Sequence, residues 1–410
     1  MTIEIFKHKS GIEVILDKND SPLIGVNFRV KVGSCNEDET QKGISHFIEH
    51  MAFTGTSTLS KDQITKEIEE SGAYLNAYTD YNNTTYTVKC MTSNFGKCLS
   101  TISDMLSDTQ FFEEEMNKER GVILQEISDR LNNPNAVLYD RFFENMYTDK
   151  CMDTNVIGTK ESVSSFTKEN MVSYYKKYYI PENMILSVAG NVDMKNIIEI
   201  LDTYFPLPIE GEITLEKTFT ITDTKNITYN NSFSQDNILW VFPLNSDSSF
   251  KTENVQTLVN MFLGSGYSSI LFKTIRDEQG LVYGISSYIY SIGKNNKMIL
   301  LTTSCDSDKS EKIYEELPKS LELMKNMTEN DLNSCKNREK FNVTNTFESR
   351  TRIASGNLEE YQHYGKIISY DENISIIDSI TLEECHEFIN ELLNIEPIKF
   401  ISKSSKQKEV

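Results

Sequence analysis

Apolar and polar positions alternate from the first residues of the chain. Ile3 and Ile5 alternate with polar neighbours, Gly11 interrupts the run, and residues 24–32 alternate again. A period of two residues is typical of strands with one buried face. The pattern predicts strand, turn and strand before residue 35, so that the fold starts at the N-terminus without a targeting segment.

A helical period of apolar residues follows, and it alternates with further strand patterns. The predicted helices cover residues 43–53, 61–70, 113–131 and 168–178, and the predicted strands cover residues 74–79, 86–91 and 185–189. Strands at 227–229 and 238–241 and a helix at 253–263 begin the second half in the same order. This repeated order predicts two structurally similar halves.

The stretch between the halves shows neither the two-residue period of strands nor the period of helices. Residues 209–223 show no helical pattern and follow Pro206 and Pro208 closely. We therefore expect a domain at residues 1–208, a linker at 209–223 and a domain at 224–410. The length of 410 residues fits two or three domains at about 100–200 residues each.

Charge and cysteine content narrow the function classes. The net charge of −20 repels a polyanion, which argues against nucleic-acid binding and favours cationic peptides, although it can also serve only solubility. The seven cysteines are odd in number and lack C-x-x-C spacing, which argues against a disulfide framework and for a reducing compartment. No apolar run approaches the ~20 residues of a membrane span. We expect a cytoplasmic protein.

The segment His46-Phe47-Ile48-Glu49-His50 carries the clearest chemical signal. At ~100° per residue, His46, Glu49 and His50 share one helix face. Two imidazoles one turn apart can bind one metal ion, and a carboxylate beside them can accept a proton from an activated water. The opposite face is apolar: Ile44, Phe47, Ile48 and Met51. The alternative is a polar helix face that carries two histidines by chance.

A third metal ligand is expected from the helix at residues 113–131. Glu126 falls beside Ile123 and Ile127 on that helix, where a carboxylate is costly unless it is paired or binds a metal. Glu119 lies two turns earlier on the same face and can hydrogen-bond a ligand histidine. A buried salt bridge of these carboxylates to Arg120 or Arg130 is the alternative.

Taken together, these residues resemble the pitrilysin/insulinase family of zinc peptidases, in its mitochondrial-processing-peptidase-like branch. Residues 43–56 (GISHFIEHMAFTGT) are similar to the metal-helix signature, and residues 119–127 to the third-ligand helix. The resemblance implies that Zn²⁺ is held by His46, His50 and Glu126. It implies that Glu49 is the catalytic base and that Glu119 is a further acidic residue needed for full activity.

Two further stretches carry the resemblance. Residues 75–79 (LNAYT) look like an edge strand that pairs with an extended substrate, and Asn76, Ala77 and Phe53 form the expected substrate-binding set; the alternative is an ordinary internal strand. Residues 262–283 look like the signature of the second domain. There the resemblance implies that Arg276 and Tyr283 bind substrate and stabilise the oxyanion. From the residues alone, Arg276 can equally pair with Asp277 or Glu278, and Tyr283 can be a core aromatic.

The resemblance also implies an architecture and a reaction, the zinc-dependent endoproteolytic hydrolysis of unfolded peptides that are presequence-like or signal-peptide-like. The fold class is α+β, with two similar domains that each form an antiparallel sheet with helices packed on one face, together a half-shell. Two chains, as a homodimer or as a heterodimer with a related subunit, would close a chamber that admits unfolded peptides. A long glycine-rich loop is absent, which is typical of a catalytic subunit. The rivals are a catalytically silent assembly subunit and a peptide-binding module without turnover.

Overall fold

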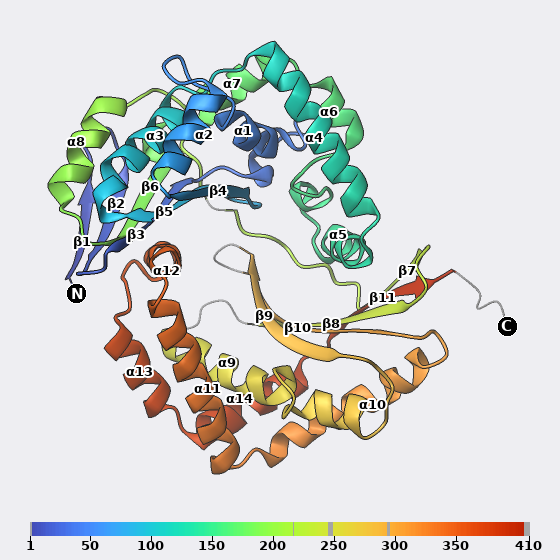
Figure 1. The fold of residues 1–410 in the computed structure, drawn as a ribbon. Coiled ribbons are helices and arrows are strands. Elements are labelled where there is room, and N and C mark those ends of the chain that lie inside the picture. The colour runs from blue at the N-terminus through green and yellow to red at the C-terminus, as the bar shows by residue number, and fades with distance from the viewer. Residues whose placement is uncertain (1, 216, 245–248, 293–295, 406–410) are drawn as a thin grey trace. The chain divides into compact units, whose positions relative to one another are not determined.

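The computed structural model describes residues 2–215, 217–244, 249–292 and 296–405 (Figure 1). The chain forms two compact units. Unit 1 comprises residues 1–132, 150–217 and 346–368, and unit 2 comprises residues 133–149, 218–345 and 369–410. The passage at 217–218 falls inside the expected linker. The units are nevertheless not contiguous halves of the chain. Residues 133–149, from the first half, belong to unit 2, and residues 346–368, from the second half, belong to unit 1.

Unit 1 contains one sheet and most helices of the first half of the chain. Its elements are β1 (Thr2–Lys7), β2 (Glu13–Lys18), β3 (Leu23–Val30), η1 (Ser34–Asn36), α1 (Ile44–Ala52), α2 (Lys61–Glu70), β4 (Tyr74–Thr79), β5 (Thr84–Met91), η2 (Thr92–Asn94), α3 (Phe95–Ser107), α4 (Glu113–Leu131), η3 (Lys150–Met152), α6 (Lys160–Ser165), α7 (Lys168–Tyr178), η4 (Pro181–Asn183), β6 (Met184–Gly190), α8 (Met194–Tyr204) and α12 (Arg350–Tyr364).

Unit 2 contains the second sheet. Its elements are α5 (Pro134–Met146), β7 (Asn226–Asn231), β8 (Asp236–Leu244), α9 (Phe250–Gly264), η5 (Phe272–Asp277), β9 (Ile285–Ile292), β10 (Asn296–Cys305), α10 (Ser310–Glu322), η6 (Leu323–Asn326), α11 (Glu329–Phe347), α13 (Tyr370–Ser379), α14 (Leu382–Asn394) and β11 (Ile398–Ser404).

The two sheets share one topology. The strand order is β1-β2-β6-β3-β5-β4 in unit 1 and β7-β11-β8-β10-β9 in unit 2. If β1 is set aside, the strands follow the same chain order and the same pairing in both sheets. The parallel pair is β2–β6 in one and β7–β11 in the other, and the remaining pairs are antiparallel. The predicted two similar domains are therefore confirmed, with one parallel pair in each otherwise antiparallel sheet.

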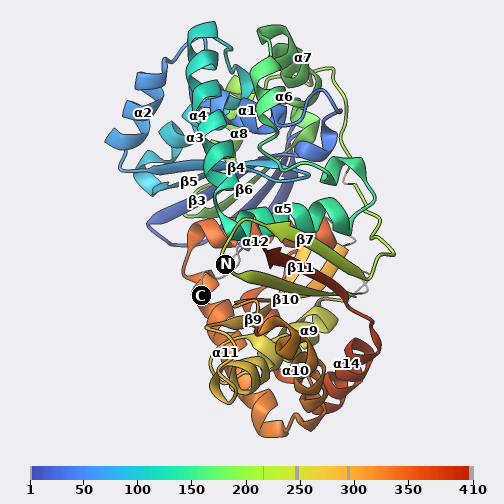
Figure 2. The same ribbon diagram turned by 90° about the vertical axis from the view of Figure 1, so that its right-hand side faces the viewer.

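Most helices cover one face of each sheet, as predicted, but the second face is covered as well. In unit 1, α12 packs across β3 and β6. Gly25 of β3 permits this contact, because a Cβ there would lie 2.2 Å from the backbone of Arg350. In unit 2, α5 lies over β7 and β11, where Phe142 contacts Phe400 with ring centroids 6.3 Å apart (Figure 2). Each covering helix comes from the other half of the chain, which explains the exchanged segments.

The core of each unit lies between its sheet and the main helix layer. All residues of β6 are buried, as are residues 236–242 of β8. Such strands need apolar cover on both faces, which fits the additional helix on each sheet. Among the described residues, no helix combines the length and the apolar character that crossing a lipid bilayer requires.

Candidate metal centre and its surroundings

The start of α1 is fixed by close neighbours. Gly43 has a φ of 91°, and a Cβ there would lie 2.8 Å from the Cα of Gly158. Glu37 accepts hydrogen bonds from the backbone N–H groups of Gly43 (2.8 Å) and Ser45 (2.9 Å), which have no acceptor within the helix. The apolar face of α1 is fully buried: Ile44, Phe47, Ile48 and Met51. This anchoring fixes where the opposite face points.

The opposite face of α1 brings together the predicted ligands. The Nε2 atoms of His46 and His50 lie 3.7 and 3.8 Å from the same Oε2 atom of Glu126 on α4. One donor atom from each of the three residues lies within 4.8 Å of the others. No second group of three His, Cys, Asp or Glu residues with this proximity occurs in the part of the chain that the structure describes.

The donor set fits a zinc ion. Distances of 3.7 and 3.8 Å are too long for hydrogen bonds. They are close to the ~3.4 Å that separates two ligand atoms when each binds a tetrahedral zinc at about 2.0–2.1 Å. Two imidazoles and a carboxylate are also the donor set of a catalytic zinc site that keeps one position open. The Glu126 side chain is 42% exposed, so it is not the carboxylate buried among apolar neighbours that the sequence predicted.

Glu119 lies behind His50. Its Oε2 is 3.1 Å from Nδ1 of His50, and its Oε1 accepts a hydrogen bond from Nζ of Lys61 at 2.9 Å. The hydrogen bond with His50, together with Lys61, lowers the pKa of Glu119 to about 2. A charged carboxylate at Nδ1 keeps the proton of His50 there and leaves Nε2 as an electron-pair donor. Arg120, the suggested salt-bridge partner, instead donates to the carbonyl oxygens of Val163 and Phe166.

The two histidines differ in electrostatic environment. Burial, and to a smaller extent the nearby His50, lower the pKa of His46 to about 3, so His46 is neutral. Burial also lowers the pKa of His50, but the hydrogen bond with Glu119 and the charges of the surrounding carboxylates outweigh burial and raise it. Nδ1 of His46 is buried and has no hydrogen-bond partner among the described residues.

Glu49 is buried beside the two histidines. Its Oε2 accepts a hydrogen bond from the hydroxyl of Thr79 at 2.6 Å. Burial raises the pKa of Glu49, and the Thr79 hydrogen bond offsets part of that effect. A raised pKa makes a carboxylate a stronger base toward water, which suits proton transfer.

A cavity of about 410 Å³ joins these groups to the edge of the sheet. Its wall includes Phe53, Asn76 and Ala77 in addition to the histidines and the three glutamates named above. Asn76 and Ala77 belong to β4, the last strand in the sheet order. The stretch 75–79 is therefore an edge strand, and the alternative of an internal strand is wrong. An edge strand has backbone groups available to pair with an extended peptide.

Comparison with known proteins identifies the family. Two family models match: insulinase (peptidase family M16) over residues 13–160, and the peptidase M16 inactive domain over residues 165–339. An uncharacterized zinc protease of Rickettsia felis is 31% identical over 400 residues, which is 95% of this chain and 95% of that protein. The chain belongs to the insulinase family of peptidases. The predicted pitrilysin/insulinase membership is thus confirmed, and the family to which the chain belongs is one of zinc proteases.

Other relatives agree with this assignment. The uncharacterized zinc protease YmxG of Bacillus subtilis is 26% identical, with 95% of each chain covered. The mitochondrial-processing peptidase subunit beta of Neurospora crassa is 32% identical over 44% of this chain and 38% of that protein. The crystal structure of a protease from Helicobacter pylori superposes with a TM-score of 0.87 at 21% identity, covering 98% of this chain and 99% of that one. That last likeness shows that the two proteins share a fold.

The other two predicted site residues of this insulinase-family chain lie in unit 2. Nε of Arg276 donates to the carbonyl oxygen of Tyr283 at 3.0 Å, and an Nη atom pairs with Asp277 at 2.9 Å. The guanidinium carbon also lies 4.5 Å from the ring centroid of Phe272. The Tyr283 residue is 93% exposed, so it is not a core aromatic. Arg276 and Tyr283 are thus neighbours, and their predicted roles toward substrate stay predictions.

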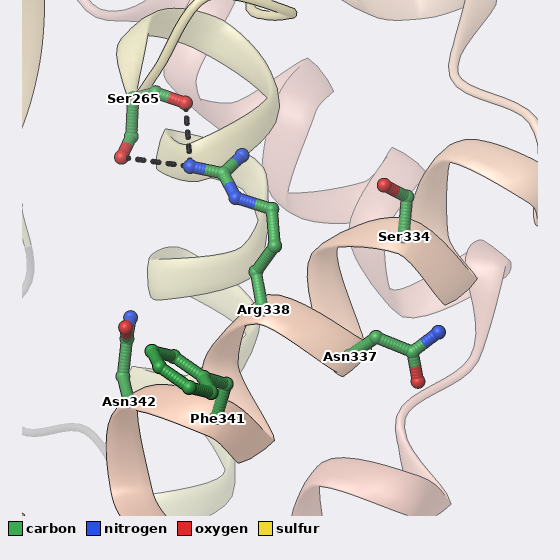
Figure 3. Close-up of a pocket in the computed structure, with 6 residues that line it drawn as sticks. All are labelled: Ser265, Ser334, Asn337, Arg338, Phe341 and Asn342. Carbon is green, nitrogen blue, oxygen red and sulfur yellow. Dashed lines mark hydrogen bonds between the residues drawn. The ribbon is translucent and has the colours of Figure 1, made fainter. Parts of the chain in front are cut away.

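Unit 2 has a cavity of its own, of about 450 Å³, along α11 (Figure 3). Its single charged side chain, Arg338, donates to the carbonyl oxygen and the hydroxyl of Ser265 at 2.7 and 3.2 Å. The other lining residues are Ser334, Asn337, Phe341 and Asn342. None of these described lining residues is a carboxylate or an imidazole. This cavity therefore lacks the donors of a zinc site.

Three residues near the metal cluster were not singled out from the sequence. Thr79 bonds Glu49, Lys61 bonds Glu119, and Glu37 holds the start of α1. Thr79 ends a strand that was predicted correctly, so its alternation with Ala77 could have placed it on the cavity side. Lys61 and Glu37 carried no such signal, because their partners are distant in the sequence or are backbone groups.

Proposed function

We propose that this chain is a zinc-dependent endopeptidase that hydrolyses unfolded peptides. The observation that carries the proposal is the convergence of His46, His50 and Glu126 in a cavity that also contains a buried glutamate and borders an edge strand. Membership of a zinc-protease family supports the same reaction class. The donor set supports zinc as the cofactor.

In this proposal His46, His50 and Glu126 hold the zinc ion. Zinc, when bound, supplies a Lewis acid that polarises the scissile carbonyl and lowers the pKa of water. Glu119 is a positioning residue, because its carboxylate contacts Nδ1 of His50. Its carboxylate keeps the imidazole in the tautomer and orientation that ligation needs.

Glu49 acts as general base and then as general acid. Its carboxylate takes a proton from the attacking water and later gives that proton to the leaving amine. The hydrogen bond from Thr79 holds the carboxyl group in one orientation. The peptide lies extended along β4, and backbone pairing at Asn76 and Ala77 aligns the scissile bond without reading the sequence.

The remaining roles rest on the resemblance and on charge. Arg276 and Tyr283 donate hydrogen bonds to the substrate and its oxyanion, and they reach a zinc site from a second chain in a homodimer or a heterodimer with a related subunit. The two chains enclose a chamber in the cytoplasm that admits unfolded, presequence-like or signal-peptide-like segments. The net charge of −20 favours basic peptides.

The test is hydrolysis of a quenched-fluorescent basic peptide by the purified chain, with zinc content measured in parallel. A chelator should abolish hydrolysis and added zinc should restore it. Glu49→Gln should lower kcat by about 10²–10⁴-fold while the protein retains its zinc. The matched control is Glu70→Gln, since Glu70 is exposed on α2 and pairs only weakly with Lys66 at 3.7 Å.

Two outcomes would overturn the proposal. If the zinc-loaded chain cleaves none of a varied panel of peptides, it is an assembly or peptide-binding subunit. If Glu49→Gln and the parent bind the same peptide and neither turns it over, the chain is a peptide-binding module without catalysis.

A further inference from the structure

Two cysteines far apart in the sequence meet inside unit 1. The Sγ atoms of Cys35 in η1 and Cys151 in η3 lie 2.7 Å apart. This separation is well below the about 3.5–4.0 Å of ordinary non-bonded contacts between heavy atoms. The two sulfur atoms therefore need to move by less than 1 Å to reach the about 2.05 Å of a disulfide bond.

The surroundings hold Cys35 firmly. Its backbone N–H donates to the carbonyl oxygen of Tyr81 at 2.8 Å, and its own carbonyl oxygen accepts a hydrogen bond from Nζ of Lys217. The side chain is fully buried, with Sδ of Met152 4.0 Å from Sγ. Cys151 is partly exposed. Cys151 is thus the more accessible residue of the pair, and Cys35 is buried in contact with it.

The pair lies where the chain enters unit 1. The chain passes from unit 2 to unit 1 between residues 149 and 150, and Cys151 is the second residue of unit 1 after this passage. Lys217, which contacts Cys35, is the last residue of unit 1 before the chain passes to unit 2. Glu37 lies two residues after Cys35 and accepts hydrogen bonds from the N–H groups at the start of α1. A bond between the two sulfurs would tie these segments together.

We propose that Cys35 and Cys151 are a redox-active pair that forms a reversible disulfide and thereby fixes the segment before α1 to the segment that re-enters unit 1. The pair is a modification site separate from the metal cluster. In the reducing compartment that we expect for this chain, such a bond is transient and formed in response to oxidant, not a permanent structural disulfide.

The oxidant is a low-molecular-weight disulfide, RSSR. The Cys151 thiolate attacks one sulfur of RSSR, which forms a mixed disulfide and releases one thiol that takes the Cys151 proton. The Cys35 sulfur then attacks the Cys151 sulfur, breaks its bond to R and releases the second thiol with the Cys35 proton. Two protein sulfurs lose two electrons in total, and RSSR gains them. Contact with Cys151 and burial raise the pKa of Cys35, so Cys35 is a poor first nucleophile toward RSSR and reacts only with the mixed disulfide held against it.

The test is treatment of the full-length chain with glutathione disulfide, followed by alkylation of the remaining thiols and mass mapping without reductant. We expect a cross-linked peptide pair containing Cys35 and Cys151, lighter by two hydrogen atoms than the separate peptides, and complete reversal by dithiothreitol. The melting temperature of the oxidised chain should rise by several degrees, because the bond closes a long loop.

Variants separate this pair from general thiol oxidation. Cys35→Ser should stop the reaction at a stable mixed disulfide on Cys151, and Cys151→Ser should abolish both cross-link and temperature shift. Cys305→Ser, which changes a buried cysteine of β10 in unit 2, should behave as the parent. A persistent mixed disulfide at Cys151 in the parent, or a cross-link without a rise in melting temperature, would overturn the proposal. Neither readout depends on peptidase activity.

Discussion

Units 1 and 2 have one strand topology but different chemistry in equivalent helices. The helix after the second shared strand is α1 in unit 1 and α9 in unit 2. Helix α1 presents two histidines and a glutamate, whereas the buried polar residues of α9 are amides: Asn254, Gln256 and Asn260. Asn254 and Asn260 donate to backbone carbonyl oxygens. The amides thus serve packing.

The long helices show the same contrast. Both α4 and α11 have 19 residues. Counted from the first residue of each helix, the positions of Glu119 and Glu126 hold Cys335 and Asn342 in α11. Asn342 lines the cavity of unit 2, as Glu126 lines that of unit 1. The two helices therefore place a cavity-lining residue at the same position, and only unit 1 has a carboxylate there.

Removing a ligand should have the largest effect. We expect His50→Ala to weaken zinc binding by more than the about 10–100-fold that is typical of losing an outer partner, and to abolish hydrolysis. Asn260→Ala on the equivalent helix of unit 2 should leave zinc content unchanged. Competition titration with a chromophoric chelator measures both. Equal zinc loss in the two variants would break the contrast between the units.

The contribution of unit 2 should appear in turnover and not in zinc content. Tyr283→Phe removes an exposed hydroxyl donor, and we expect kcat to fall by about 10²–10³-fold. Steady-state kinetics with the fluorescent peptide checks this. Tyr267→Phe, at another exposed tyrosine of unit 2, is the control. An unchanged kcat in Tyr283→Phe would remove Tyr283 from the proposed oxyanion site.

Glu119 should affect the zinc affinity of the site through its hydrogen bond with His50. We expect Glu119→Gln to lower zinc affinity by about 10–100-fold, because the amide keeps hydrogen bonding to His50 but loses the charge. At saturating zinc, much of the activity should return. Hydrolysis measured against free zinc concentration separates an effect on zinc affinity from a direct catalytic role. In a catalytic role, saturating zinc would not restore the activity of Glu119→Gln.

The last prediction concerns the pH dependence of the free energy of unfolding, which involves neither zinc binding nor turnover. Burial raises the pKa of Glu37 to about 8 from 4.5, although the N–H groups of Ser45 and Gly43 and the charge of Lys42 lower it. The folded chain therefore holds a proton that the unfolded chain releases. Its stabilising effect is complete below pH 4.5 and is lost as pH rises to about 8, with a slope of about 1.4 kcal/mol per pH unit.

Thermal unfolding between pH 5 and 8.5 checks the slope. Glu37→Gln should flatten the curve, and Glu39→Gln, at an exposed neighbour, should not. The equivalent helix α9 is capped by the neutral hydroxyl of Ser249, which accepts from the N–H of Thr252, so this titration belongs to unit 1. Parallel curves for Glu37→Gln and the parent would contradict the assignment.

Strong periodicity made part of the fold predictable. The structural bounds of α2, β4 and α4 coincide with the predicted ones, because apolar spacing and end signals agree there. Helices α3, α5 and α8 were not predicted. Helix α5 begins at Pro134, directly after Asn133, whose side chain caps it by accepting from the N–H groups of residues 135 and 136.

The long-range features were not accessible in the same way. The exchange of α5 and α12 between the units depends on which sheet face lacks cover, which no local pattern encodes. In the site, helix period placed His46, Glu49 and His50 together, and Glu126 followed from its place on a second helix and from the resemblance. The contacts Thr79–Glu49 and Lys61–Glu119 join residues 30 and 58 positions apart in the sequence, so no local pattern predicts them.

The central claim is that zinc belongs to the His46, His50 and Glu126 cluster of unit 1. Anomalous X-ray diffraction at the zinc edge, from crystals of the zinc-loaded chain, locates the ion directly. We predict a peak about 2.0–2.2 Å from Nε2 of both histidines and from the Glu126 carboxylate. A zinc peak at the cysteines or in unit 2, with none at this cluster, would contradict the account.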